Sequence, residues 1–79
     1  MMEINNWPGH RIKRCRKYLS LSQNKLAIHL GITQPTVAKL ENGYVSSNIY
    51  AEKIEKWWQK EQSKIIASLY DEIKFIKSL

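Results

Sequence analysis

Apolar residues recur at intervals of three and four along most of the chain, which is the repeat of amphipathic α-helices. The first such segment covers residues 10–19 and follows a chain break at Pro8-Gly9. Its inward face consists of Ile12, Cys15, Arg16 and Leu19. The pattern therefore predicts a first helix at this position, and no segment alternates as a strand would.

Two shorter helices with a tight turn between them are predicted next. Ser22 and Thr33 each stand where a side-chain oxygen can cap the first turn of a helix. Gly31 can end the first of the two helices in the left-handed conformation, and Pro35 falls in the first turn of the second, where a missing N–H costs little. The inward residues are Leu26, Ala27, Leu30, Val37 and Leu40. The second helix should end at Asn42-Gly43.

The second half of the chain contains neither Gly nor Pro from residue 48 to residue 78. One apolar face consists of Ile49, Ile54 and Trp58, and a second consists of Ile65, Ile66, Leu69, Ile73 and Ile76. This pattern predicts helices over 48–59 and 62–78, or one bent continuous helix. Trp57 and Trp58 cannot both face one core, so we expect Trp58 in the core and Trp57 at an interface.

These elements predict an all-α fold in which residues 1–79 form a single domain, a bundle of about five short helices. The N-terminal segment carries Glu3 and no long apolar run, which argues against a signal peptide, and nothing resembles a membrane span. Cys15 is the only cysteine, so no intrachain disulfide can form, and a reducing cytoplasm fits best.

The positive charge is concentrated in the first half of the chain. Residues 1–40 hold seven Lys and Arg against one acid, whereas residues 41–79 hold six bases and six acids. An excess of this kind beside a compact motif is typical of a protein that binds a polyanion, although solvated basic helices are also common.

The two short helices carry a recognisable pattern of residue types. It reads Leu21-Ser22-Gln23-x-x-Leu26-Ala27-x-x-Leu30-Gly31-Ile32-Thr33-Gln34-x-x-Val37-Ala38-x-Leu40-Glu41-Asn42-Gly43. This closely resembles the helix-turn-helix family of the Cro and phage-repressor type, in which the second helix of the motif lies in the DNA major groove. The resemblance covers roughly residues 12–43 and implies a five-helix fold that extends loosely to residue 66.

The resemblance implies that Gln34, Pro35 and Lys39 face base edges. A glutamine amide suits adenine, a lysine ammonium suits the acceptors of guanine, and a proline can contact a thymine methyl group. Pro35 replaces a side chain that is often polar in relatives. The positions of Gln23, Thr36 and Asn42 correspond to phosphate contacts, although helix capping or simple solvation is the alternative for Gln23 and Thr36.

Two further groups of charged residues have expected roles. The loop after Gly43 contains no Lys or Arg, so we expect phosphate affinity to depend on the first helix, through Arg11, Arg14 and Lys17. Arg16 lies on the apolar face, and the resemblance pairs it with Glu41 in a structural ion pair.

The stripe Ile66, Leu69, Ile73 and Ile76 follows the 3-4-3 spacing of a helix–helix contact, and we expect it to form a dimer interface. The alternative is that these residues fill the core of one molecule. Because the stripe spans little more than two heptads, we also expect it to pack as part of the globule.

The sequence thus predicts a regulator that binds double-stranded DNA in a sequence-specific manner. It would act as a homodimer on a palindromic operator and repress transcription, most simply by blocking polymerase. The alternative is an antitoxin-type module whose C-terminal part binds a toxin while the motif autoregulates the operon. No nucleophile–base pair, phosphate-binding Gly loop or pair of facing acids suggests an enzyme, and His10 and His29 are isolated, so neither a metal nor another cofactor is expected.

Overall fold

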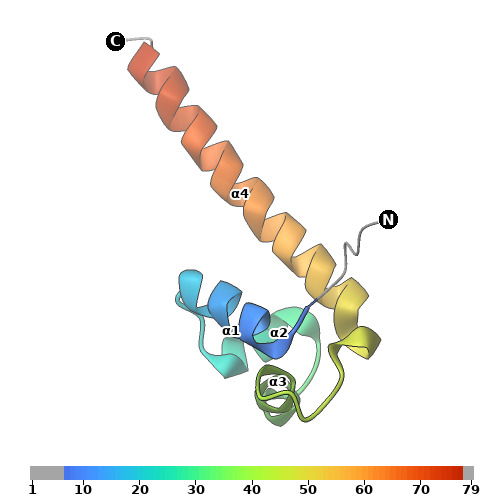
Figure 1. Cartoon of the computed structure of the whole chain (residues 1–79). Helices are drawn as coiled ribbons and strands as arrows, with labels where there is room; N and C mark the ends of the chain where they lie inside the picture. The colour runs from blue at the N-terminus through green and yellow to red at the C-terminus, as the bar shows by residue number, and fades with distance from the viewer. Residues whose placement is uncertain (1–6, 78–79) are drawn as a thin grey trace.

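Four α-helices and one short 3-10 turn make up the computed structural model, which describes residues 7–77. They are α1 (Gly9–Tyr18), α2 (Gln23–Leu30), α3 (Gln34–Glu41), the 3-10 turn η1 (Ser47–Tyr50) and α4 (Ala51–Lys77). The first three helices form a cluster, and α4 leaves that cluster as a long rod (Figure 1). The all-α prediction is confirmed, but the two expected C-terminal helices are one, so there are four α-helices instead of five.

Capping side chains and a glycine define where α2 begins and ends and where α3 begins. The Ser22 hydroxyl accepts a hydrogen bond from the backbone N–H of Lys25 at 3.1 Å, and Thr33 accepts one from Thr36 at 3.4 Å. Gly31 ends α2 with a φ of 70°, the left-handed conformation that a residue without a Cβ adopts freely. Both predicted N-caps and the predicted glycine stop are therefore confirmed.

The core lies where α1, α2, α3 and the start of α4 meet. Its buried apolar residues are Trp7, Ile12, Cys15, Leu26, Ala27, Leu30, Val37, Leu40, Ile54 and Trp57. Burial raises the pKa of the Cys15 thiol, with a smaller opposing effect from nearby arginines. Cys15 is therefore a protonated, small core residue, as the sequence pattern suggests.

Trp7 is a core residue that the helical pattern does not reveal. Its side chain is 1% exposed, and its indole N–H donates to a carboxylate oxygen of Glu55 in α4 at 2.8 Å. The Arg11 guanidinium lies 3.8 Å from the centroid of the Trp7 ring, a cation–π contact. Trp7 therefore ties the segment before α1 to the start of α4.

The expected roles of Trp57 and Trp58 are reversed in the structure. Trp57 is buried and follows Ile54 by three residues on the face of α4 that packs against the cluster. Trp58 is half-buried, with its ring centroid 5.8 Å from that of Trp57 and 6.4 Å from that of Trp7. Ile49, which was also expected on the apolar face, is 77% exposed. It lies in η1, before α4 begins, so the helical spacing that links it to Ile54 does not apply.

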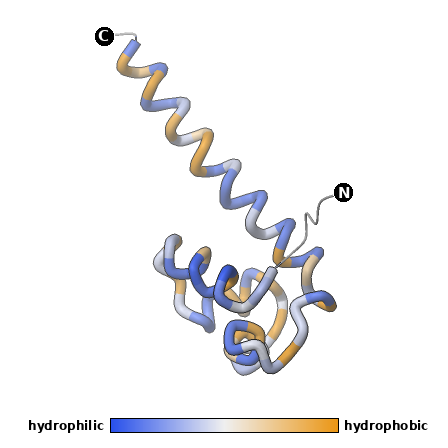
Figure 2. The backbone as a smooth tube through the Cα atoms, in the orientation of Figure 1, coloured by the Kyte–Doolittle hydropathy of each residue, from blue (hydrophilic) through white to orange (hydrophobic). Residues whose placement is uncertain are grey.

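The C-terminal part of α4 does not pack as part of the globule. No residue of α4 beyond Trp57 is buried within the described chain, and the stripe of Ile66, Leu69, Ile73 and Ile76 is exposed. Figure 2 shows hydrophobic residues recurring along the projecting rod. The expectation that this stripe packs within the globule is therefore wrong, as is the alternative that it fills the core of one molecule.

Arg16 and Glu41 form a buried ion pair that joins α1 to the end of α3. The Arg16 Nε donates to Glu41 Oε2 at 2.6 Å, and Nη2 donates to Oε1 at 3.0 Å. Arg16 Nη1 donates to the Leu21 carbonyl at 2.8 Å, so the guanidinium also fixes the link between α1 and α2. The hydrogen bond to Glu41 raises the pKa of Arg16 despite the opposing effect of burial, and the arginine stays charged.

A close backbone approach occurs next to this pair. A Cβ added to Gly9 would lie 2.5 Å from the carbonyl oxygens of Leu40 and Glu41. Only glycine leaves room for the N-terminus of α1 to abut the C-terminus of α3 in this way. The contact and the ion pair therefore act together to fix α3 against α1.

We expect Arg16→Ala to lower the free energy of unfolding by about 3 to 5 kcal/mol in the absence of DNA, because it leaves the Glu41 carboxylate buried without its cation. Urea denaturation followed by circular dichroism measures this loss. Lys13→Ala is the matched control, since it removes a positive charge from an exposed position of the same helix. Equal unfolding free energies for the two variants would contradict a structural role for Arg16.

Candidate nucleic-acid interface

The helices α2 and α3 form a bihelical unit with a short turn at residues 31–33. The backbone N–H of Ile32 donates to the Ala27 carbonyl at 3.0 Å, which closes the end of α2 around the left-handed Gly31. Val37 and Leu40 anchor α3 in the core. The turn and these two anchors leave the opposite face of α3 open to a ligand.

The exposed face of α3 carries the residues expected to read bases. Gln34 and Pro35 are exposed in its first turn, and Lys39 is exposed four residues after Pro35, on the same side of the helix. Thr36 is half-buried, and its hydroxyl lies 2.7 Å from that of Thr33. The structure thus gathers the three candidate reading residues on one accessible surface.

A chain of hydrogen bonds connects this surface to the buried ion pair. The Gln34 Nε2 donates to Gln23 Oε1 at 2.7 Å, and the Gln23 Nε2 donates to Glu41 Oε1 at 3.1 Å. Glu41 in turn is held by Arg16. The first residues of α2 and α3 are therefore fixed to each other and to α1. Each glutamine is the first residue of its helix. This shared position is the only feature of the sequence that points to their contact.

Asn42 and Gln23 lie at the same edge of the bihelical unit. Asn42 is exposed and caps the C-terminus of α3, next in the chain to the Glu41 that bonds to Gln23. The N-terminal backbone amides of α2 open at this edge. Polar donors of this kind, beside a helix N-terminus, suit a phosphate oxygen.

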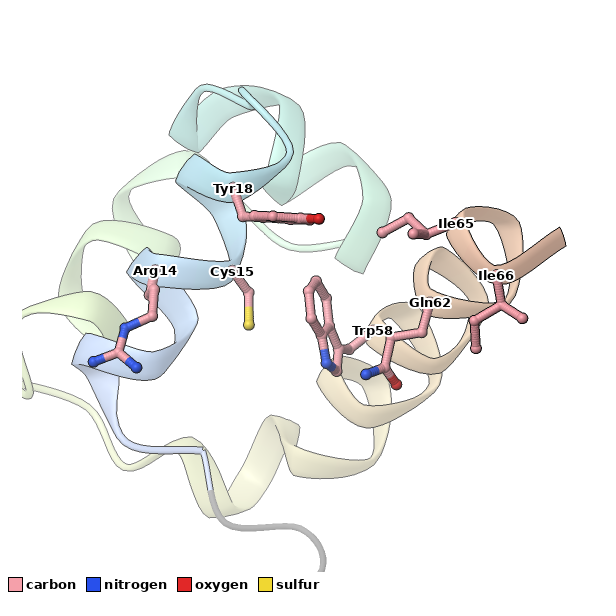
Figure 3. Close-up of a pocket in the computed structure, with 7 residues that line it drawn as sticks. All are labelled: Arg14, Cys15, Tyr18, Trp58, Gln62, Ile65 and Ile66. Carbon is pink, nitrogen blue, oxygen red and sulfur yellow. The ribbon is translucent and has the colours of Figure 1, made fainter. Parts of the chain in front are cut away.

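The basic residues of α1 point to two different sides. Successive residues of a helix are about 100° apart, so Gly9, Lys13 and Lys17 form one row, and Gly9 abuts the end of α3. Arg14 belongs to the rim of a cavity that Tyr18 and Trp58 also line, and its guanidinium points away from α4 (Figure 3).

The three residues of α1 that were expected to contact phosphate therefore do not share one side of the helix. Lys17 shares the row of Gly9, whose backbone abuts the end of α3, whereas Arg11 stacks on Trp7 and Arg14 is at the rim of the cavity between α1 and α4. Lys13 shares the row of Lys17 and is exposed, although it is not among the phosphate contacts expected from the sequence. Its position four residues from both Gly9 and Lys17 is the signal that would have identified it.

Residues 7–77 contain no group of three or more His, Cys, Asp or Glu side chains that could hold a metal ion. None of the helices in this range has the length and apolarity needed to cross a membrane.

Comparison with known proteins agrees with this geometry. The family model described as Helix-turn-helix matches residues 12–56, which include α2, the turn, α3 and the first turns of α4. No curated protein and no solved structure gives a significant match to the chain. The match covers more than half of the chain and contains the bihelical unit with its exposed α3. The chain belongs to the helix-turn-helix family of the Cro and phage-repressor type, whose members are DNA-binding regulators of transcription.

Proposed function

We propose that this regulator recognises a specific operator as a homodimer and represses transcription by occluding polymerase. The observation that carries the proposal is the exposed face of α3, whose first residue, Gln34, is held by hydrogen bonds that lead back to a buried ion pair. A surface fixed before binding loses little conformational freedom in the complex, which favours both affinity and specificity.

The hydrogen bond between the two glutamines still permits base recognition. One N–H of the Gln34 amide donates to Gln23. The second N–H can still donate to adenine N7, and Oε1 can still accept from adenine N6. Lys39, one turn further along α3, can donate to the O6 and N7 acceptors of guanine. Pro35, on the same surface, offers an apolar contact to a thymine methyl group.

Backbone contacts should set the register of α3 in the groove. Gln23 and Asn42 lie at one edge of the reading surface, Thr36 lies in the first turn of α3, and Lys17 extends the positive charge along α1. Arg11 and Arg14 are the weaker candidates for this role, because Arg11 stacks on Trp7 and Arg14 is at the rim of the cavity between α1 and α4.

The dimer would form through the projecting part of α4. Ile66, Leu69, Ile73 and Ile76 are exposed on a helix that the rest of the chain does not cover. An exposed stripe of apolar side chains usually marks a surface that binds another protein. A second copy would bring two reading helices to one palindromic site, as repressors of this type require.

An antitoxin-type module is the second candidate, and the same exposed stripe favours it. In that case the stripe would bind a partner protein of another sequence instead of a second copy. Light scattering of the purified chain, with and without the product of a neighbouring gene, separates the two functions. A chain that is monomeric alone and forms a stoichiometric complex with that product would support the module.

For the reading surface, we expect Lys39→Ala to reduce the preference for the operator over a single-base variant by roughly 1 to 3 kcal/mol. Lys17→Ala should weaken binding to all duplexes alike and lower the salt dependence of affinity, because it removes one phosphate contact. Fluorescence anisotropy with operator, variant and random duplexes at several salt concentrations measures both effects. Arg14→Ala removes the same charge at the rim of the cavity between α1 and α4 and should have a smaller effect than Lys17→Ala. Identical losses for Lys39→Ala on operator and random DNA would show that α3 does not read bases at this position.

For the dimer, we expect the double variant Leu69→Glu/Ile73→Glu to be a folded monomer with greatly reduced operator affinity. Neither residue contributes to the core, so the unfolding transition of the cluster should be retained. Light scattering and circular dichroism measure the two properties. Ala67→Glu/Ser68→Glu adds the same charge at positions outside the stripe and should remain dimeric. A wild type that is monomeric at high micromolar concentration would contradict the dimer.

A further inference from the structure

The exposed apolar residues of α4 follow the heptad spacing of a coiled coil. Ile66 and Ile73 occupy a positions, and Leu69 and Ile76 occupy d positions. These side chains are 66%, 52%, 54% and 65% exposed in the same order. No residue of α4 after Trp57 is buried, and every described residue from Ile66 to Lys77 is exposed. This part of the helix therefore presents a continuous strip to a second helix.

We propose that two copies of α4 pair in parallel and in register along this strip. The proposal rests on the proposed homodimer and specifies how its two subunits are arranged. The strip thus packs on the same strip of a second copy. Each a or d residue faces the identical residue of the partner across a two-fold axis that runs along the two helices.

The residue types at the strip favour two parallel strands. A β-branched residue at a together with Leu at d is the combination that selects parallel dimers, because each shape fits the packing geometry of its own layer. Ile66, Leu69 and Ile73 follow this rule. Ile76 at the last d position departs from it, and Ile at both a and d favours more strands, so the subunit number must be measured along with the orientation.

Charges beside the strip favour the parallel orientation. Glu72 occupies a g position and Lys77 the following e position, which face each other between the helices of a parallel pair. Neither residue takes part in an ion pair within residues 7–77. An antiparallel pair centred on the same strip brings g positions together, and the two Glu72 carboxylates would then face each other.

The position of α3 gives an independent argument for the same orientation. Figure 1 shows α3 on the side of the cluster remote from the C-terminal end of α4. Parallel rods therefore place both reading helices at one end of the dimer, where a single duplex can meet both. Antiparallel rods would place them at opposite ends.

The strip also continues into a cavity between α1 and α4. Trp58, Gln62 and Ile65 of α4 line this cavity of about 360 Å³, opposite Cys15 and Tyr18 of α1 (Figure 3). Gln62 is the d position before Ile66, and Trp58 and Ile65 are g positions. In a parallel pair the cavity lies next to the two-fold axis, so the partner can cover it. This added apolar contact supplements a coil that is short by itself.

Disulfide trapping in the full chain tests the orientation, with Cys15→Ala as the background to remove the competing thiol. Ile76→Cys should form a covalent dimer rapidly under mild oxidation, since parallel d positions face each other at a separation that a disulfide can span. Phe75→Cys, one residue away and outside the strip, is the matched control and should crosslink far more slowly. An equimolar mixture of Ile66→Cys and tagged Ile76→Cys should give no mixed product.

Charge reversal provides a second readout that needs no new thiol. Glu72→Lys should raise the dimer dissociation constant roughly tenfold, and adding Lys77→Glu should restore it, because two ion pairs are first lost and then rebuilt. Circular dichroism checks that each variant keeps its helical content.

The results distinguish this inference from the proposed function. Preferential trapping of the mixed Ile66→Cys and Ile76→Cys product would establish antiparallel rods, and trimers in light scattering would exclude a two-stranded pair. Either result overturns the inference and leaves a self-associating regulator in place. A wild type that stays monomeric and shows no trapping overturns the dimer itself.

Discussion

The structure depends on a buried ion pair between two helices that are far apart in sequence. A charge on the apolar face of α1 is tolerated only because Glu41 meets it with two hydrogen bonds and the Leu21 carbonyl accepts a third. Burying such a pair is costly unless its remaining polar atoms are also satisfied. Gln23 donates to the same carboxylate, and so the requirement to satisfy Glu41 fixes the start of α2.

Fixing these elements also fixes the surface that we propose meets DNA. Gln34 is bonded to Gln23, and both are connected through Glu41 to Arg16. The reading face of α3 therefore owes its orientation to the interior of the protein. The close contact of Gly9 with the end of α3 acts in the same direction, because it removes the freedom of α3 to tilt away from α1. One set of hydrogen bonds thus links the stability of the fold to the orientation of the proposed reading face.

Local features of the fold could be predicted from the sequence because their causes are local. Ser22, Thr33 and Gly31 define the ends of α2 and the start of α3 by capping chemistry that acts within a few residues. The burial of Leu26, Val37 and Leu40 follows from helical spacing.

Features that depend on contacts between distant segments could not be predicted in this way. Trp7 belongs to no helix, and its burial requires Glu55 and Trp58, far along the chain. The choice between Trp57 and Trp58 depends on the angle at which α4 crosses the cluster, which helical periodicity does not contain. The mutual bond of Gln23 and Gln34 needs α2 and α3 to be docked first. Likewise, the apolar stripe on α4 is visible in the sequence, but its spacing does not distinguish a residue that packs inward from one that meets another molecule.

The prepared face of α3 is proposed to read DNA sequence. Selection of binding sites from a pool of random duplexes tests this most directly, because it assumes no operator. A dimer that reads bases through α3 should enrich a two-fold-symmetric sequence whose half-sites have centres about 10 base pairs, or one helical turn, apart. Retention of duplexes without enrichment of any sequence would show that α3 does not read bases.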